Sequence, residues 1–366
     1  MSAFTMTPLD LVIEPEVGNA NEVAGILNPG AARGPDGHLY LFPRIVAEGN
    51  YSRIGILRVL FDEQGEPNGV ERVGIALEPE MPYELRPDGG GCEDPRVSFV
   101  EPLNCYLMTY TAFSPDGPRI AVATSTDLLT WERLGLAEFD PYEGIHFDGI
   151  DNKDACMFPV AIPNPEYELE LAILHRPLFP GTLPEDTLAQ GEDRSVDLHR
   201  ESIWISYRRP GPIQTPLRLT GLSSHHRLAA PVYEWEALKI GSGAPPVMTK
   251  HGWLFVYHGV ADVIGAGDVD QLTYSAGVMV LDRERPQELL YRSSHPVLTP
   301  EQNPKDPRRG SPKNVVFPTG LDRRDDIGQP DRLDVYYGLN DFRIGVARLD
   351  VPDVLPHTGE ADPPKN

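Results

Sequence analysis

The stretch CYLMTYT at residues 105–111 decides the expected fold, because such an apolar and aromatic run favours a β-strand and runs of this kind return along the whole chain. The recurrences are HLYLFPR at 38–44, LAILHR at 171–176, WLFVYHG at 253–259 and DVYYG at 334–338. They follow one another at intervals of roughly 65 to 80 residues, too long for a solenoid repeat but suited to a four-stranded propeller blade with long loops. Five such runs predict an all-β, five-bladed β-propeller.

A second short run follows each of these stretches and supports the count. The second runs are RIGIL at 53–57, RIAVA at 119–123, SIWISY at 202–207, YSAGVMV at 274–280 and RIGVA at 343–347. Short β-branched and aromatic runs between turn residues predict antiparallel strands. A propeller cannot be divided between blades without exposing strand edges, so we expect one domain over 1–366, with its core at about 22–350 and peripheral terminal segments. A radial array of blades also brings equivalent strand ends to one central pocket.

The composition limits the partners and the chemistry. The 366 residues carry 55 acidic and 32 basic side chains, a formal net charge of −23, which disfavours nucleic acid and anionic membranes as partners. The three cysteines lack CxxC spacing, and the ten histidines lack HxH or HxxxH spacing, so we expect neither a metal site nor a metal cofactor. The N-terminus has no basic and apolar leader pattern, which predicts a cytoplasmic protein.

The segment GGGCEDPR at 89–96 is the most informative candidate for chemistry. Three glycines allow the backbone to approach a ligand closely, and Pro95 is expected to hold Asp94 in an extended conformation. The functional interpretation is a rigid loop that presents Asp94 as an acid, with Arg96 nearby. The alternative is an Asp-Pro turn with a structural bridge between arginine and carboxylate.

Polar residues occur at a similar phase in every repeat, so we expect them to converge in the central pocket. The expected donors are Arg44, Arg96, Lys153, His175, Arg176 and Lys239. The expected carboxylates are Asp94, Asp154 and Asp341, and the expected aromatic walls are Tyr40, Tyr110, Trp235, Tyr257 and Phe317. Carboxylates and aromatic faces suit a sugar, whereas clustered cations suit phosphate. The pattern therefore predicts chemistry that involves both a sugar and phosphate.

The order of the motifs resembles glycoside hydrolase family 130. The motifs are NPG at 28–30, GCEDPR at 91–96, KDA at 153–155, HRP at 175–177, KIG at 239–241, YHGV at 257–260 and YYG at 336–338. The resemblance runs from about Asn28 to Leu349. It implies a five-bladed propeller and an inverting glycoside phosphorylase that uses inorganic phosphate as co-substrate and no cofactor. Its substrates would be β-linked mannosides, and its products α-mannose 1-phosphate and a shortened sugar.

The same resemblance implies roles for individual residues. Asp94 would be the proton donor, acting through the 3-hydroxyl of the mannosyl unit. The phosphate ligands would be Arg44, Lys153, His175, Arg176 and Lys239. The substrate contacts would be Asn28, Glu93, Arg96, Asp154, Tyr257, Phe317 and Asp341.

Several alternatives remain open from the sequence. The linkage can be β-1,2 or β-1,4, and assembly into a homo-oligomer is not decided. A hydrolase on the same scaffold would need a carboxylate that activates water, for which Glu93, Glu234 and Glu236 are the candidates. A propeller that only binds glycans or proteins would not need cations gathered around an acid.

Overall fold

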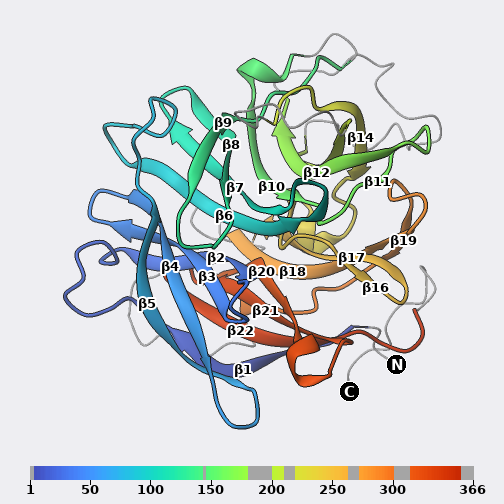
Figure 1. The fold of residues 1–366 in the computed structure, drawn as a ribbon. Helices are drawn as coiled ribbons and strands as arrows, with labels where there is room; N and C mark the ends of the chain where they lie inside the picture. Colours follow the sequence, from blue (N-terminus) through green and yellow to red (C-terminus); the bar gives the residue numbers. More distant parts are fainter. Residues whose placement is uncertain are drawn as a thin grey trace.

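The protein is built almost entirely of β-strands (Figure 1). The computed structural model describes residues 4–142, 146–179, 200–209, 219–262, 272–300 and 314–355. The last residues of the single domain expected over 1–366 therefore lie outside the described residues. In the described part of the chain, no helix is long and apolar enough to span a membrane.

Antiparallel pairing divides the strands into five successive units. Unit one contains β2 (Gly25–Arg33), β3 (Leu39–Ala47), β4 (Tyr51–Phe61) and β5 (Pro67–Leu77). Unit two contains β6 (Gly90–Val100), β7 (Cys105–Ser114), β8 (Gly117–Ser125) and β9 (Glu132–Leu136). Unit three contains β10 (Asp151–Met157), β12 (Leu169–Leu178), β13 (Ile203–Arg208) and β14 (Ser223–Ala229), with β11 (Ile162–Pro163) beside β12.

Units four and five complete the order. Unit four contains β15 (Lys239–Ser242), β17 (Gly252–Asp262), β18 (Leu272–Leu281) and β19 (Leu289–Arg292), with β16 (Val247–Thr249) beside β17. Unit five contains β20 (Asn314–Arg323), β21 (Arg332–Leu339), β22 (Arg343–Asp350) and, from the other end of the chain, β1 (Met6–Ile13). All ten strands expected from the paired sequence runs are confirmed. Strand β1 precedes residue 22, so the sheet structure begins earlier than the expected core.

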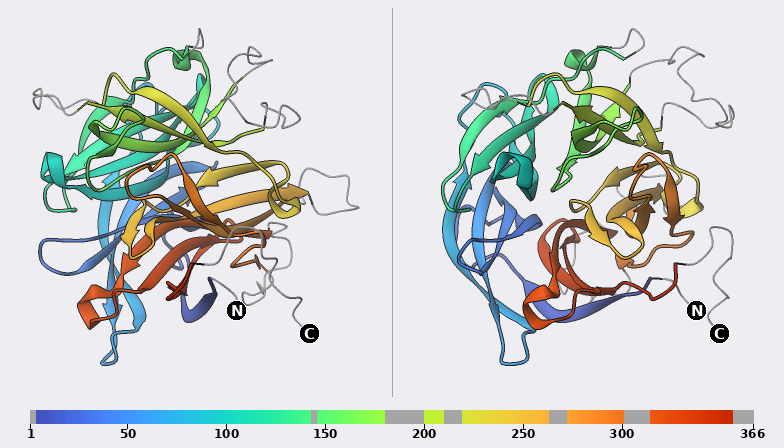
Figure 2. Two further views of the ribbon diagram at one scale, coloured as in Figure 1. Left: turned by 90° about the vertical axis from the view of Figure 1, so that its right-hand side faces the viewer. Right: turned by 45° about the vertical axis from the view of Figure 1, so that its right-hand side comes forward.

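The hydrophobic core is divided among the junctions between units. Separate apolar clusters lie between units one and two, two and three, three and four, and four and five. A further cluster joins unit five back to unit one, where Tyr336 and Ile344 pack with Leu39 and Leu41. The first strands contact one another: β2 with β6 and β20, β6 with β10, and β10 with β15. The right-hand view of Figure 2 accordingly shows the units gathered around the middle of the molecule.

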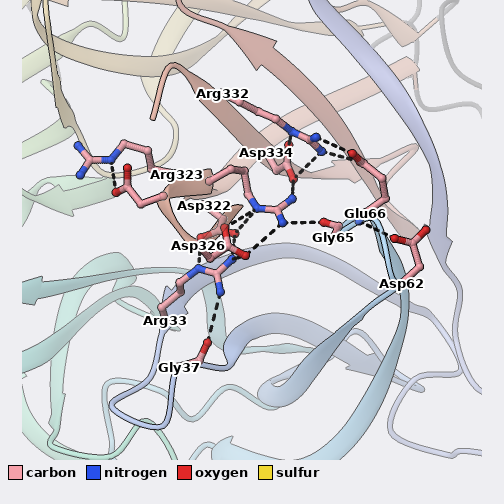
Figure 3. A network of polar contacts seen from close by, with 12 residues as sticks. Arg33, Gly37, Asp62, Gly65, Glu66, Asp322, Arg323, Asp326, Arg332 and Asp334 are labelled. Atoms are coloured by element: carbon pink, nitrogen blue, oxygen red, sulfur yellow. Dashed lines mark hydrogen bonds and ion pairs between the residues drawn. The ribbon is translucent and has the colours of Figure 1, made fainter. Parts of the chain in front are cut away.

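A charged network also joins units one and five (Figure 3). Arg33 at the end of β2 donates to Asp322 of β20, with Nε 2.8 Å from Oδ1. Arg332 of β21 reaches Glu66, just before β5, with Nη1 2.5 Å from Oε1. These contacts link the first complete unit of the chain to the last one by ion pairs as well as by apolar packing.

Candidate active site

A cavity of about 350 Å³ opens where the first strands of the units meet. Four units supply its polar groups, and the loop between β21 and β22 supplies one more. The lining residues are Asn28, Arg44, Glu93, Asp94, Lys153, Asp154, Arg176, Lys239, Leu272, Tyr274, Val315, Phe317 and Asp341.

Three polar residues of the cavity occupy equivalent breaks in strands β2, β6 and β10. Asn28, Asp94 and Asp154 have positive φ values of 47°, 47° and 55°. Each lies where the pairing with the next strand shifts register. Non-glycine residues in this conformation are strained, and a bulge re-aims the side chain that it carries. The extended conformation expected for Asp94 from the following proline is therefore wrong, because a bulge places this residue in the left-handed region.

Asp94 is held by neighbours on three sides. Its Oδ1 accepts a hydrogen bond from Nδ2 of Asn28 at 2.8 Å and lies 3.5 Å from Nη1 of Arg44. Arg96 Nη1 donates to the backbone carbonyl of Asp94 at 2.8 Å. The Asp94 side chain is 15% exposed, so it is largely enclosed but open to the cavity. This arrangement fixes the direction in which the carboxyl group points.

Glu93 is tied to the same arginine. Nη2 of Arg44 lies 2.9 Å from Oε1 of Glu93, and Nε of Arg44 donates to Oγ of Ser52 at 2.9 Å. Ser52 in turn donates to Glu93 at 3.3 Å. Burial raises the pKa of Glu93, Arg44 lowers it, and the charge of Asp94 adds to the rise. Two carboxylates thus share one arginine.

Asp154 is the charged centre of the opposite wall. Its Oδ2 accepts from Nε of Arg176 at 2.6 Å, and its Oδ1 accepts from Nη2 of Arg96 at 3.3 Å. His258 lies on the same carboxylate, with Nε2 3.5 Å from Oδ2. Burial disfavours the charged form, but Arg176, His258 and Arg96 outweigh it and hold the pKa of Asp154 well below its usual range. This carboxylate therefore stays ionised and positions the two arginines.

Three cations of the cavity lie together. Burial lowers the pKa of Lys153, and the charge of Arg176 lowers it further. Burial and the charges of Arg176 and Lys153 lower the pKa of Lys239 to about 8. Among the described residues, the Lys153 ammonium group has no hydrogen-bond or ion-pair partner. The mutual repulsion of these three cations identifies a place where an anion would be stabilised.

Aromatic rings form the wall next to Asp154. The ring centroids of His258 and Phe317 are 4.3 Å apart, and those of Tyr274 and Phe317 are 6.3 Å apart. Arg96 stacks over Phe317 with its Cζ 5.5 Å from the ring centroid, and Lys239 lies 5.9 Å from the ring centroid of Tyr274. The cavity therefore combines ionic groups with flat apolar surface.

Most residues expected in the site lie together in this cavity. Those that line it are Asn28, Arg44, Glu93, Asp94, Lys153, Asp154, Arg176, Lys239, Phe317 and Asp341. The exceptions are His175, Arg96 and Tyr257.

His175 points away from the cavity. Successive side chains of a strand alternate between its faces, so Arg176 faces the cavity and His175 enters the core of unit three. Its Nδ1 pairs with Oδ1 of Asn152 at 3.1 Å and its Nε2 with Oγ of Ser206 at 2.7 Å. Phe139 packs on its ring at 4.6 Å, and burial lowers the pKa of His175 well below its usual range. A neutral, fully paired imidazole at this place is not a phosphate ligand.

Arg96 and Tyr257 act behind the cavity wall. Arg96 is 1% exposed and donates hydrogen bonds to Asp154 and to backbone carbonyls, including that of Ser242. Tyr257 is buried and donates to Oε2 of Glu236 at 2.9 Å. Neither lines the cavity, so their expected direct contacts with substrate are not supported by the geometry.

The other expected aromatic walls also lie elsewhere. Tyr40 donates to Asp36 at 2.7 Å and Tyr110 to Glu84 at 2.6 Å, both at the junction of units one and two. Trp235 packs on Tyr257 outside the cavity. Of the five aromatic residues expected around the pocket, Phe317 alone lines it.

The sequence reasoning missed four residues at the site. Leu272, Tyr274 and Val315 line the cavity, and His258 supports Asp154 from behind. Tyr274 and Val315 meet because β18 and β20 run parallel there, which no local pattern reveals. Tyr274 begins the strand run YSAGVMV, and an aromatic residue at a strand end was a usable signal.

Residues 4–360 match the model of glycoside hydrolase family 130, described as β-1,4-mannooligosaccharide phosphorylase. The chain belongs to glycoside hydrolase family 130. This membership makes it an enzyme of the glycoside phosphorylase type.

Relatives within family 130 resemble most of the chain. A 1,2-β-oligomannan phosphorylase of Thermoanaerobacter sp. (strain X514) is 30% identical over 346 residues, 94% of this chain and 96% of the relative. A β-1,4-mannooligosaccharide phosphorylase of Ruminococcus albus is 32% identical over 264 residues, 72% of this chain and 63% of the relative. Among solved structures, the β-1,2-mannobiose phosphorylase of Listeria innocua in complex with β-1,2-mannobiose has a TM-score of 0.64 at 22% identity, with 94% of each chain covered. That last likeness concerns the fold.

Proposed function

We propose that this protein catalyses the inverting phosphorolysis of β-linked mannosides, releasing α-mannose 1-phosphate and a shortened sugar. The observation that carries the proposal is that one cavity holds both a group of carboxylates and a group of cations. Asp94, Glu93 and Asp341 gather around Arg44, and Lys153, Arg176 and Lys239 form the cationic end of the cavity beside Asp154. A phosphorylase needs an acid for the leaving sugar and cations for the attacking anion.

Asp94 would supply the proton in this reaction. In its protonated form it gives a proton to the 3-hydroxyl of the mannosyl unit, and that hydroxyl passes its own proton to the bridging oxygen. The bond between the anomeric carbon and the bridging oxygen breaks, and the oxygen leaves as a hydroxyl group of the shortened sugar. The hydrogen bonds of Asn28 to the Asp94 carboxyl group and of Arg96 to the Asp94 backbone carbonyl hold the carboxyl group in one direction, which supports this proton transfer.

Phosphate would bind at the cationic end and attack the anomeric carbon from the opposite face, which inverts its configuration. The lowered pKa values of Lys153 and Lys239 support this assignment. A bound anion would relieve the repulsion among the three cations, raise both pKa values and keep both ammonium groups charged. Phosphate is already a nucleophile, so the reaction needs no second carboxylate as base.

The contacts of the candidate bases favour the phosphorylase over the hydrolase. Glu236 is buried and bonded to Tyr257 and Arg292, and Glu234 does not line the cavity. Glu93 does line it, but Arg44 and Ser52 occupy its oxygen Oε1. A hydrolase would require one of these carboxylates to orient and deprotonate a water molecule.

We also infer that the five units are the blades of a five-bladed propeller. The apolar junctions that follow one another from unit one to unit five, and from unit five back to unit one, support this architecture. The pairing of β1 with β22 would then close the last blade with the N-terminal strand.

The test is an incubation with β-1,2-mannobiose and with β-1,4-mannobiose, each with and without inorganic phosphate. The expected result is mannose 1-phosphate that forms only when phosphate is present, with one linkage strongly preferred. Release of free mannose without phosphate would refute the proposal in favour of hydrolysis.

A further inference from the structure

Glu201 lies against the cationic end of the cavity, although it is not among the residues that line the cavity. Its Oε2 contacts Nη1 of Arg176, and its Oε1 lies 3.6 Å from Nζ of Lys239. Its side chain is 21% exposed. One carboxylate thus bridges two of the three cations that we assign to phosphate.

The backbone holds Glu201 in this place. It lies two residues before β13, and its carbonyl accepts a hydrogen bond from the Ile240 amide in β15 at 3.1 Å. Arg200 is bonded to the carbonyl of Ala237 at 3.3 Å. The approach to β13 is therefore fastened to the strand that carries Lys239, and the two side chains are held side by side.

The two carboxylates that contact Arg176, Asp154 and Glu201, differ in how deeply they are buried. Nε of Arg176 serves Asp154, which is buried at the back of the wall and fully committed to arginines and His258. Glu201 is the more exposed of these two carboxylates, and its two oxygens contact Arg176 and Lys239. Asp154 therefore holds Arg176 in place, whereas Glu201 offsets part of the positive charge that would attract an incoming anion.

We propose that Glu201 is an internal counter-anion of the phosphate site, which competes with phosphate for Arg176 and Lys239 and so sets the affinity of the enzyme for phosphate. This inference rests on the proposed function. A dianion that enters the cationic end meets the negative charge of Glu201 at short range and must take over its two partners. Glu201 is a positioning residue in this account and takes no part in bond making or breaking.

The consequence is an enzyme tuned to a high phosphate concentration. Phosphorolysis is reversible, and weak phosphate binding also means weak retention of the phosphate group in mannose 1-phosphate. The carboxylate therefore favours release of that product at the expense of affinity for the co-substrate. Removing its charge should affect phosphate and mannose 1-phosphate together and leave the sugar acceptor unaffected.

The experiment compares the wild type with Glu201→Gln, which keeps the size of the side chain and one acceptor oxygen but removes its charge. Glu234→Gln, an exposed carboxylate outside the cavity, is the matched control. Binding of inorganic phosphate is measured by isothermal titration calorimetry without sugar, and KM values for phosphate and for mannobiose are measured in turnover. The expected result for Glu201→Gln is phosphate binding tighter by roughly fivefold or more, a lower KM for phosphate and an unchanged KM for mannobiose.

The possible results separate this inference from the proposed function. Unchanged or weaker phosphate binding by Glu201→Gln, with phosphorolysis intact in the wild type, overturns the role of Glu201 alone. Failure of the wild type to bind phosphate overturns both proposals. Phosphate-independent release of mannose that Glu201→Gln abolishes also overturns both, because Glu201 would then be activating water.

Discussion

Replacement of Arg44 by methionine tests whether Glu93 is committed to an ion pair and so is not available as a base. Arg44 and Glu93 are 15% and 11% exposed, and Nη2 lies 2.9 Å from Oε1. Removing one partner of a buried pair costs about 3–5 kcal/mol, because an uncompensated charge remains. Glu93 keeps its bond from Ser52 and can take up a proton, so we expect a loss of about 3 kcal/mol at pH 8, near the lower limit.

The loss should depend on pH in a defined direction. Burial raises the pKa of Glu93 in the folded state above its value in the unfolded state, with Arg44 working against the rise. A carboxyl group with a raised pKa favours folding when it is protonated and opposes folding as the pH rises through the folded pKa. Without Arg44 this pKa rises further. The difference in stability between variant and wild type should therefore shrink to about 1 kcal/mol at pH 5.

The assay is urea unfolding at pH 5 and pH 8, followed by tryptophan fluorescence. The double variant Arg44→Met/Glu93→Gln should recover about 2 kcal/mol relative to Arg44→Met at pH 8. Arg58→Met, which breaks the surface pair with Glu71, is the control and should cost below about 1 kcal/mol. A loss at pH 8 no larger than this control, or a double variant no more stable than Arg44→Met, would refute the reasoning.

Three further predictions concern the acid, the phosphate site and the fold. Asp94→Asn should lower kcat by about 10²- to 10⁴-fold with unchanged urea unfolding, and near-normal turnover would remove Asp94 from its role. The KM for phosphate should rise as the pH passes the Lys239 pKa of about 8, because the ammonium group loses its charge. The variant Lys239→Arg should flatten this rise, because the guanidinium group stays charged. An equally steep pH profile in that variant would contradict the assignment of Lys239 to the phosphate site. Arg324→Met should cost about 3–5 kcal/mol in urea unfolding, because Arg324 is buried between Asp334 at 2.6 Å and Asp326 at 3.0 Å in unit five and donates to the carbonyl of Gly65 in unit one at 2.6 Å. A loss below about 1 kcal/mol would show that these contacts do not help to hold units one and five together.

Local sequence patterns were sufficient to predict the two central strands of each unit. Runs such as CYLMTYT and YSAGVMV carry their β-propensity within a few residues, and each of them is a strand. The spacing of these runs also predicted five units. The role of β1 could not be predicted, because its partner β22 lies at the other end of the chain.

The site residues were predictable as a set but not in their orientation. His175 and Arg176 are neighbours on one strand, and only the register of the sheet decides which of them reaches the cavity. Lys153 and Asp154 are also neighbours, yet both reach it, because the bulge at Asp154 breaks the alternation. The pairing of Glu201 with Lys239 depends on two units meeting in space, which no local pattern encodes.

The most direct test of the account is the identity and configuration of the first product, followed by phosphorus and proton NMR during turnover of mannobiose in phosphate buffer. The account predicts that α-mannose 1-phosphate appears first and in equal amount to the released sugar. Two molecules of free mannose from each mannobiose without any mannose 1-phosphate, or the β-anomer of mannose 1-phosphate, would contradict inverting phosphorolysis at this cavity.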